Sequence, residues 1–170
     1  MGTRNITYPT AIFFHIVRIG CLQFAPEVGD IDNNLNRADS VLNRANRNKF
    51  ESLDLLVFPE MAFTGYNFEL LKEIQPYFKP KGSGISAFWA RTTAFKYDCK
   101  VALGYPESST DWSGPIRYFN LLLLVNKDGE TLANYKKQHL YYTDEIWCKE
   151  GTGGFFQSQM DGIGQTAMGI

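Results

Sequence analysis

The amino-acid sequence predicts an α/β domain in which a sheet is layered against helices. Short apolar runs bounded by proline or glycine alternate with stretches of helical periodicity, a pattern typical of strands and helices that share a core. Of the 170 residues, 44% are hydrophobic and 21% are charged, as in globular proteins. No repeat and no flexible linker divides the sequence. We therefore expect one domain over residues 18–170, preceded by an N-terminal extension, residues 1–17, whose structure the pattern leaves uncertain.

The first half of the predicted domain contains two strands and one helix. Residues 18–24 alternate into an apolar run that ends before a proline, which is typical of a buried strand. Residues 54–58 form a short apolar run, which predicts a strand covered on both faces. Between them Asp30 or Asp32 can cap a helix, because apolar side chains recur with helical spacing at Leu35, Ala38, Leu42 and Ala45.

The second half adds a helix and three strands. A helix is predicted over residues 86–97, and a strand over residues 101–105 follows it. The apolar runs 119–126 and 130–139 flank an Asp-Gly pair, which is a strong signal for a β-hairpin. Crossover and hairpin connections are therefore expected in the same sheet.

The last residues, 162–170, predict a turn followed by one more buried strand, which ends on an apolar residue without a turn signal. A carboxylate at the tip of a buried strand is costly unless it reaches solvent or a cation. We therefore expect the complete protein to continue beyond this strand.

Charge and cysteine content argue against several classes of protein. Lys and Arg number 17 and Asp and Glu number 18, so the net charge is −1, which provides no basic surface for nucleic acid. The longest aliphatic run, residues 121–125, is far shorter than the ~20 residues of a membrane span, and no signal peptide is apparent. Three widely spaced cysteines match neither a disulfide framework nor a zinc site. We expect a cytoplasmic protein that uses no metal and no cofactor and binds neither nucleic acid nor membranes.

Glu60 is the first candidate for a chemical role. It follows the predicted strand 54–58, and in open α/β sheets the reactive groups lie just past the carboxyl ends of strands. The residues around it are apolar and aromatic, so a carboxylate there is desolvated and suited to act as a general base. The alternative is a solvated loop residue without a chemical role.

Lys137 is the second candidate, and its neighbour Lys136 is the comparison. The period of two in a strand points these adjacent side chains to opposite faces. If both faces are covered, one ammonium is buried and needs a carboxylate partner, for which Glu60, Asp144 and Glu145 are available. The alternative is an edge strand on which both lysines are exposed and discourage aggregation.

No nucleophile is evident in the sequence. Cys148 lies beside Lys149, whose ammonium can favour a thiolate, but a buried thiol without a chemical role is the stronger interpretation. His15 and His139 form neither a serine-type catalytic order nor a metal-binding pair at helical spacing. We expect both histidines to be packing or surface residues.

Several separated segments resemble, in the same order, the motifs of the nitrilase or carbon-nitrogen hydrolase superfamily. They are residues 22–30 with 33–35, 58–60 with 64–66, 104–107, 126–130 and 134–140. Residues 59–68 and 140–147 further resemble the fungal protein N-terminal amidases, which deamidate amino-terminal Asn and Gln.

This resemblance implies an αββα sandwich with a catalytic Glu-Lys-Cys set. Glu60 matches the family's general base, and Lys137 matches the residue that stabilises the oxyanion of the tetrahedral intermediate. A second glutamate of the family, which precedes a Trp and a Gly, is matched by Glu145, although Asp144 fits nearly as well. The family's cysteine follows a strand that ends in Gly-Ile, and the sequence stops at such a pair, so the nucleophile is expected outside these residues.

Three functions remain open at this point. The first is an amidase of protein amino termini, represented by its amino-terminal portion, with peptides or proteins beginning with Asn or Gln as substrates. The second is another amidase or nitrilase of the superfamily that acts on small amides. The third is a noncatalytic remnant, which is either a gene fragment or a decoy that pairs with full-length subunits through the exposed edge of its sheet.

Overall fold

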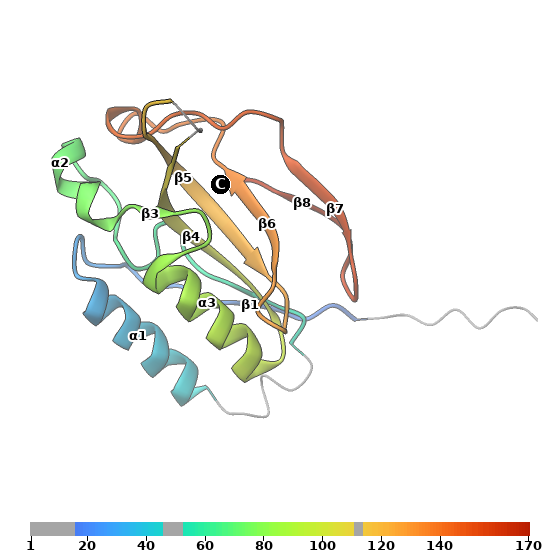
Figure 1. Cartoon of the computed structure of the whole chain (residues 1–170). Helices are drawn as coiled ribbons and strands as arrows, with labels where there is room; N and C mark the ends of the chain where they lie inside the picture. The colour runs from blue at the N-terminus through green and yellow to red at the C-terminus, as the bar shows by residue number, and fades with distance from the viewer. Residues whose placement is uncertain (1–15, 46–52, 111–113) are drawn as a thin grey trace, which may run out of the picture.

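The computed structural model describes residues 16–45, 53–110 and 114–170, so all but two residues of the predicted extension lie outside it. Figure 1 shows a mixed sheet with two long helices on one side and a β-hairpin on the other. The helical elements are α1 (Ile31–Arg44), α2 (Leu71–Ile74), η2 (Gln75–Tyr77), α3 (Gly84–Tyr97) and η3 (Asp144–Ile146), where η marks a 3₁₀ turn. The strands are β1 (Ile19–Cys21), β2 (Leu55–Val57), β3 (Lys79–Pro80), β4 (Lys100–Ser109), β5 (Arg117–Val125), β6 (Thr131–Lys136), β7 (Phe156–Met160) and β8 (Gly164–Met168). The predicted α/β class is confirmed.

Within the described residues the main sheet has six strands, in the order β1-β2-β4-β5-β6 with the short β3 paired to β4. β1, β2 and β4 are parallel, because the crossovers that join them contain α1 and α3. β5 and β6 continue the sheet in antiparallel fashion. The turn between them is closed by a bond from the N–H of Asn126 to the carbonyl of Glu130 at 2.8 Å. The predicted combination of crossovers and a hairpin is confirmed.

Both predicted helices are confirmed, and their starts depend on local structure. Asp30 caps α1, because its side chain accepts a hydrogen bond from the N–H of Asn33 at 3.3 Å. α3 begins at Gly84, slightly before its predicted start, and its C-cap Asp98 is left-handed, with φ of +51°. α2, η2 and β3 are absent from the sequence prediction, because elements this short carry no periodic signal.

The predicted strands of the main sheet are confirmed with different lengths. β1 is shorter than the predicted strand, because the chain leaves the sheet after Leu22, whose N–H donates to the carbonyl of Val57 at 2.9 Å. β4 extends to Ser109 along its partner β5. β6 ends at Lys136 instead of residue 139. Lys137 therefore lies at the carboxyl end of its strand rather than inside it.

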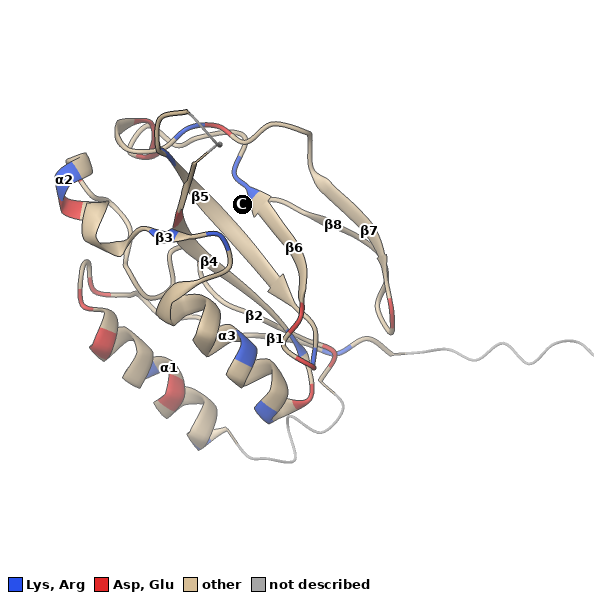
Figure 2. Cartoon of the chain, in the orientation of Figure 1, with Lys and Arg blue, Asp and Glu red and all other residues tan. Residues whose placement is uncertain are grey.

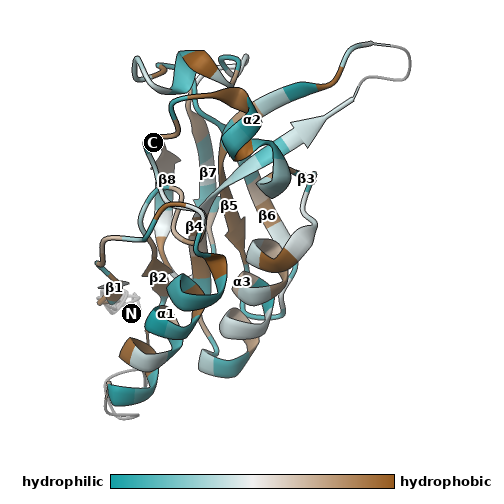
Figure 3. Cartoon of the chain, turned by 90° about the vertical axis from the view of Figure 1, so that its left-hand side faces the viewer, coloured by the Kyte–Doolittle hydropathy of each residue, from teal (hydrophilic) through white to brown (hydrophobic). Residues whose placement is uncertain are grey.

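The two faces of the main sheet bury different sets of side chains. Val101 and Leu103 of β4 pack against α1 and α3, whereas Ala102 between them packs with Tyr135 against the β7–β8 hairpin. Alternate residues of one strand thus belong to different cores, and both faces are covered. Figure 3 shows the apolar residues concentrated in the central strands, and Figure 2 shows charged residues on the helices and near strand ends.

β7 and β8 form a separate two-stranded antiparallel sheet. Met160 and Met168 are buried against the main sheet, while alternate residues of both strands are exposed. The predicted strand within residues 162–170 is confirmed as β8, and it is buried on one face only. β7 is absent from the sequence prediction, since three of its five residues are polar.

Close packing of the Glu60 loop on β4 depends on Gly104. A Cβ atom there would lie 2.9 Å from the backbone nitrogen of Met61 and 3.0 Å from Cα of Glu60. We expect Gly104→Ala to lower the free energy of unfolding by about 1–3 kcal/mol, because the loop backbone must move away. Denaturant unfolding measures this loss. Gly20→Ala is the control, since its Cβ would meet only leucine side-chain atoms, the nearest at 3.3 Å; equal losses in both variants would contradict the explanation.

Candidate active site

Glu60 lies just past the carboxyl end of β2, as predicted, in a loop held by β4. The N–H of Phe58 donates to the carbonyl of Ala102 at 2.9 Å, and the N–H of Ala62 donates to the carbonyl of Gly104 at 3.3 Å. These two bonds flank Glu60 and fix its backbone against the neighbouring strand. Its side chain is 31% exposed, so the carboxylate lies at the boundary between solvent and interior.

Lys137 follows β6 directly, and its side chain is only 7% exposed. Its ammonium nitrogen Nζ lies 2.7 Å from Oε1 of Glu60 and 2.7 Å from Oδ2 of Asp144. Lys136 points to the other face of the sheet, where its Nζ lies 3.8 Å from the centre of the Phe119 ring. The predicted alternation of the two lysines is confirmed, and the burial of Lys137 excludes a pair of exposed edge lysines.

Asp144, rather than Glu145, is the second carboxylate beside Lys137. Asp144 begins η3, its side chain is 0% exposed, and its Oδ2 also accepts the N–H of Tyr141 at 3.2 Å. Glu145 is exposed. Successive residues of a 3₁₀ turn point about 120° apart, so only one of the two can face the lysine. Asp144 is therefore the residue in contact with Lys137, and the catalytic role predicted for Glu145 stays a prediction that this geometry does not favour.

Asn120 joins the two carboxylates from β5, and the sequence prediction assigns it no role. The residue is 0% exposed. Its Nδ2 donates to Oε1 of Glu60 at 2.5 Å and to Oδ1 of Asp144 at 3.5 Å. A signal exists in the sequence, because Asn120 is the one polar residue in the apolar run 119–125. Pattern alone does not say which groups it meets.

Tyr66 adds a hydroxyl to the same cluster, from the segment 64–66 on which the family resemblance partly rests. The Nζ of Lys137 donates to this hydroxyl at 3.4 Å. Burial raises the pKa of Tyr66 above its usual value, and the hydrogen bond to Asp144 and the charge of Glu60 act in the same direction. The hydroxyl therefore stays protonated at neutral pH.

The charge of Lys137 follows from two opposing effects. Burial alone would lower the pKa of its ammonium, but hydrogen bonds to Asp144 and Glu60 and the charges of both carboxylates outweigh burial and raise the pKa above its usual value. The side chain is therefore a cation throughout the physiological range. Such a group can stabilise developing negative charge but cannot act as a base.

The cysteines of the chain supply no activated thiol to this cluster. Cys21 is exposed in β1, and Cys99 is buried. The side chain of Cys148 is buried among apolar residues that include Met61 and Trp147. Burial raises the pKa of Cys148 to about 12, so it is a thiol rather than a thiolate at neutral pH.

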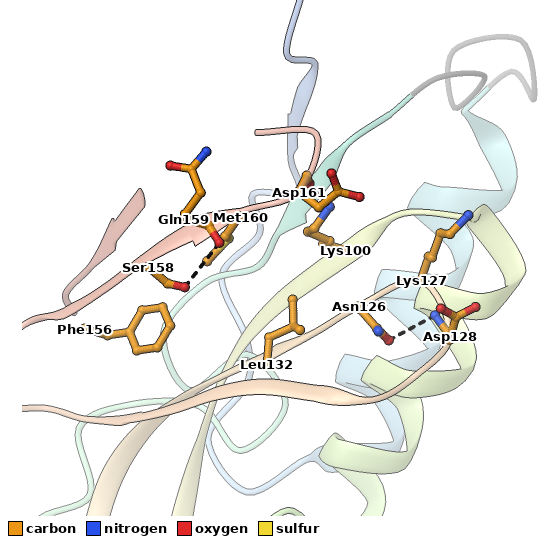
Figure 4. Close-up of a pocket in the computed structure, with 10 residues that line it drawn as sticks. All are labelled: Lys100, Asn126, Lys127, Asp128, Leu132, Phe156, Ser158, Gln159, Met160 and Asp161. Carbon is orange, nitrogen blue, oxygen red and sulfur yellow. Dashed lines mark hydrogen bonds between the residues drawn. The ribbon is translucent and has the colours of Figure 1, made fainter. Parts of the chain in front are cut away.

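Three further findings concern a surface hollow, metal binding and membrane-spanning helices. A hollow of about 400 Å³ lies between the β7–β8 hairpin and the β5–β6 turn. Figure 4 shows residues that line it, among them Lys100, Asn126 and Asp161. In the part of the chain that the structure covers, no group of three or more His, Cys, Asp or Glu side chains is arranged to hold a metal ion. No helix in these ranges is long and apolar enough to cross a membrane.

A profile of the carbon-nitrogen hydrolase family matches residues 18–161, and the chain belongs to this family. The chain is 33% identical over 147 residues, 85% of its length, to the protein N-terminal amidase of Saccharomyces cerevisiae. It is 32% identical over 156 residues, 91% of its length, to the protein N-terminal amidase of Schizosaccharomyces pombe. The chain spans 31% and 54% of the lengths of these two relatives.

Solved structures support the same assignment of the fold. A crystal structure of N-terminal amidase superposes with a TM-score of 0.75 at 32% identity, covering 85% of this chain and 33% of that chain. Structures of that protein with Asn-Glu and Gln-Gly peptides superpose equally well. Nit3 of Saccharomyces cerevisiae superposes with a TM-score of 0.73 at 20% identity, covering 90% of this chain and 54% of that chain, and shows the shared fold alone. The predicted nitrilase-like fold is confirmed.

The two adjacent acidic residues of η3 allow a matched test of the buried ion pair. Asp144→Asn should lower the free energy of unfolding by roughly 2–4 kcal/mol, because the fully buried partner of Lys137 becomes neutral and only the partly exposed Glu60 stays paired with the ammonium. Glu145→Gln should change it by less than about 0.5 kcal/mol, because this side chain is exposed. Chemical denaturation of both variants at neutral pH measures the difference. A larger loss for Glu145→Gln would reverse the assignment.

Proposed function

We propose that this chain is the amino-terminal portion of an amidase that hydrolyses the side-chain amide of amino-terminal Asn or Gln in peptides and proteins. The observation that carries the proposal is the Lys137 ammonium held between Glu60 and Asp144, in a chain similar to protein N-terminal amidases over most of its length. A cytoplasmic location and assembly into oligomers stay predictions.

The proposed reaction assigns Glu60 the role of general base and Lys137 that of oxyanion stabiliser. A cysteine outside these 170 residues supplies the nucleophile, because in the described residues no cysteine side chain bonds to Glu60 or Lys137, and burial raises the pKa of Cys99 and Cys148. Glu60 takes the thiol proton, and the thiolate forms a bond to the amide carbon. The C–N bond then breaks, ammonia leaves with that proton, and water deprotonated by Glu60 hydrolyses the thioester.

The hydrogen bonds of Lys137 support its part in this scheme. An ammonium has three N–H donors, and two of them bind Glu60 and Asp144 at 2.7 Å. The third reaches the hydroxyl of Tyr66 at 3.4 Å, the longest of the three contacts. An oxyanion that replaces this weak contact gains a charge-assisted hydrogen bond without loss of either carboxylate.

The rival functions differ in what they require. An enzyme for small amides or nitriles would use the same three charged residues with another pocket. A noncatalytic remnant requires no arrangement of these groups, so a buried cation balanced by two carboxylates is an unexplained cost for it. The resemblance of segments 59–68 and 140–147 to N-terminal amidases favours the first function over the small-amide enzyme.

The test uses an extended chain, in which the remainder of the Schizosaccharomyces pombe relative continues this sequence after Ile170. The extended chain should release ammonia from a peptide that begins with Asn, and the 170-residue chain alone should not, because it lacks the cysteine that the proposed reaction places outside it. Ammonia release by the shorter chain, abolished by Cys148→Ser, would restore Cys148 as the nucleophile.

Substitutions of the charged residues test the proposed roles in the extended chain. Glu60→Gln removes the base and should lower kcat by about 10²-fold or more, and Lys137→Met should lower it by a similar factor because the oxyanion loses its cation. Lys136→Met is the control, since its side chain lies on the other face of the sheet. Steady-state ammonia release measures all three. A large loss in Lys136→Met with full activity in Lys137→Met would refute the assignment.

Substrate choice separates the two enzymatic functions. The extended chain should deamidate peptides that begin with Asn or Gln and fail on the same peptides after acetylation, because acetylation removes the α-ammonium charge and adds bulk. The ratio of kcat/KM for free and acetylated peptides is the measurement. Equal values, or a preference for small aliphatic amides or nitriles, would assign the chain to the small-amide enzymes and leave Glu60 and Lys137 in their roles.

A further inference from the structure

Asn120 forms hydrogen bonds with all three charged residues of the site, two through its side chain and one through its backbone. Its Nδ2 donates to Oε1 of Glu60 at 2.5 Å and to Oδ1 of Asp144 at 3.5 Å. Its backbone carbonyl accepts the N–H of Lys137 at 2.9 Å. Because the residue is completely buried, these contacts act on the three charged residues rather than on a substrate in solution.

The arrangement of charges creates a need for this amide. Glu60 and Asp144 each place an oxygen 2.7 Å from the same lysine nitrogen, so two negative charges lie close together. The two carboxylate groups must be held next to each other around one nitrogen atom. An N–H donor that both groups share stabilises this arrangement without adding charge.

The orientation of the Asn120 amide indicates that its donor side is the important one. The carbonyl oxygen Oδ1 is buried and has no hydrogen-bond partner, which is unfavourable for a polar atom. The opposite orientation of the amide would bring that oxygen against two carboxylates. The side chain thus keeps both donor contacts at the expense of its acceptor.

We infer that Asn120 is a positioning residue, which holds the carboxylates of Glu60 and Asp144 in place on either side of Lys137. Without this donor, the partly exposed carboxylate of Glu60 loses its hydrogen bond to the buried amide. A base that moves more freely is in the reactive position for a smaller fraction of encounters with the thiol.

Asn134 offers a matched control on the other face of the sheet. Its Nδ2 donates to Oε2 of the buried Glu107 at 3.0 Å, and its own Oδ1 is likewise buried without a partner. The register pairs Asn134 with Leu123 of β5, which lies three residues after Asn120. Because residues an odd number apart in a strand point to opposite faces, the two amides lie on opposite sides of the sheet. Asn134→Ala therefore removes the same kind of hydrogen bond from a carboxylate that lies outside the site.

The kinetic experiment rests on the proposed amidase function and uses the extended chain. Asn120→Ala should lower kcat at least about tenfold with little change in KM. Separate values of kcat and KM distinguish a misplaced base from weaker substrate binding. Asn134→Ala should leave kcat unchanged. An equal loss of kcat in both variants, or none in Asn120→Ala, would overturn the positioning role.

A second measurement does not depend on amidase activity and uses the 170-residue chain itself. Acetic anhydride should modify Lys137 slowly in the parent chain, because the ammonium is buried and paired. In Asn120→Ala its rate relative to the exposed Lys127 should rise about tenfold as the carboxylates release it. Peptide mapping by mass spectrometry gives both rates. Asn134→Ala should show the parent ratio, and equal ratios in the two variants would overturn the inference.

These two readouts separate the inference from the function on which its kinetic part rests. An extended chain without any amidase activity would refute the proposed function, while the modification rates of Lys137 would still decide the role of Asn120. If Asn120→Ala does not fold, Asn120→Ser replaces it in both experiments, because the hydroxyl leaves a smaller void and keeps a weaker donor. A circular-dichroism spectrum like that of the parent is the criterion of folding.

Discussion

A lysine ammonium that is almost fully removed from water needs negative charge beside it, and this requirement organises the end of the sheet at which Lys137 lies. The carboxylates of Glu60 and Asp144 both contact this one ammonium. The uncharged side chains of Asn120 and Tyr66 lie beside the carboxylates as further hydrogen-bond donors. The groups come from the loop after β2, from β5, from the end of β6 and from η3, so charge balance ties together segments that are distant in the sequence.

The fold can satisfy this constraint because the main sheet is covered on both sides. With both faces buried, the alternation along the strand directs Lys137 toward the carboxylates and Lys136 toward the ring of Phe119. The lack of a side chain at Gly104 lets the backbone of the Glu60 loop approach β4. Packing thus determines where the side chains of Glu60 and Lys137 lie, and the ion pairs stabilise the buried ammonium in that position.

The parts of the site that local rules govern were predictable from the sequence. A glutamate directly after an apolar strand lies at a sheet edge, and two adjacent lysines in a strand must diverge. The other parts depend on contacts between distant segments. Whether Asp144 or Glu145 faces inward is decided by a single 3₁₀ turn that has no periodic signal. The role of Asn120 depends on the register between β5 and β6, and β7 has too many polar residues to be distinguished from a loop.

The reactivity of a thiol depends on its electrostatic surroundings, as a comparison of Cys148 with the surroundings of Glu60 and Lys137 shows. Cys148 is only four residues from Asp144, yet apolar neighbours surround it and its pKa rises to about 12. A thiol placed beside Glu60 and Lys137 would meet a carboxylate that can accept its proton and a permanent cation that favours the thiolate. The described residues already hold that acceptor and that cation in fixed positions. The electrostatic surroundings of a thiol, more than its position in the sequence, therefore decide its reactivity, and Glu60 and Lys137 provide surroundings that differ from those of Cys148.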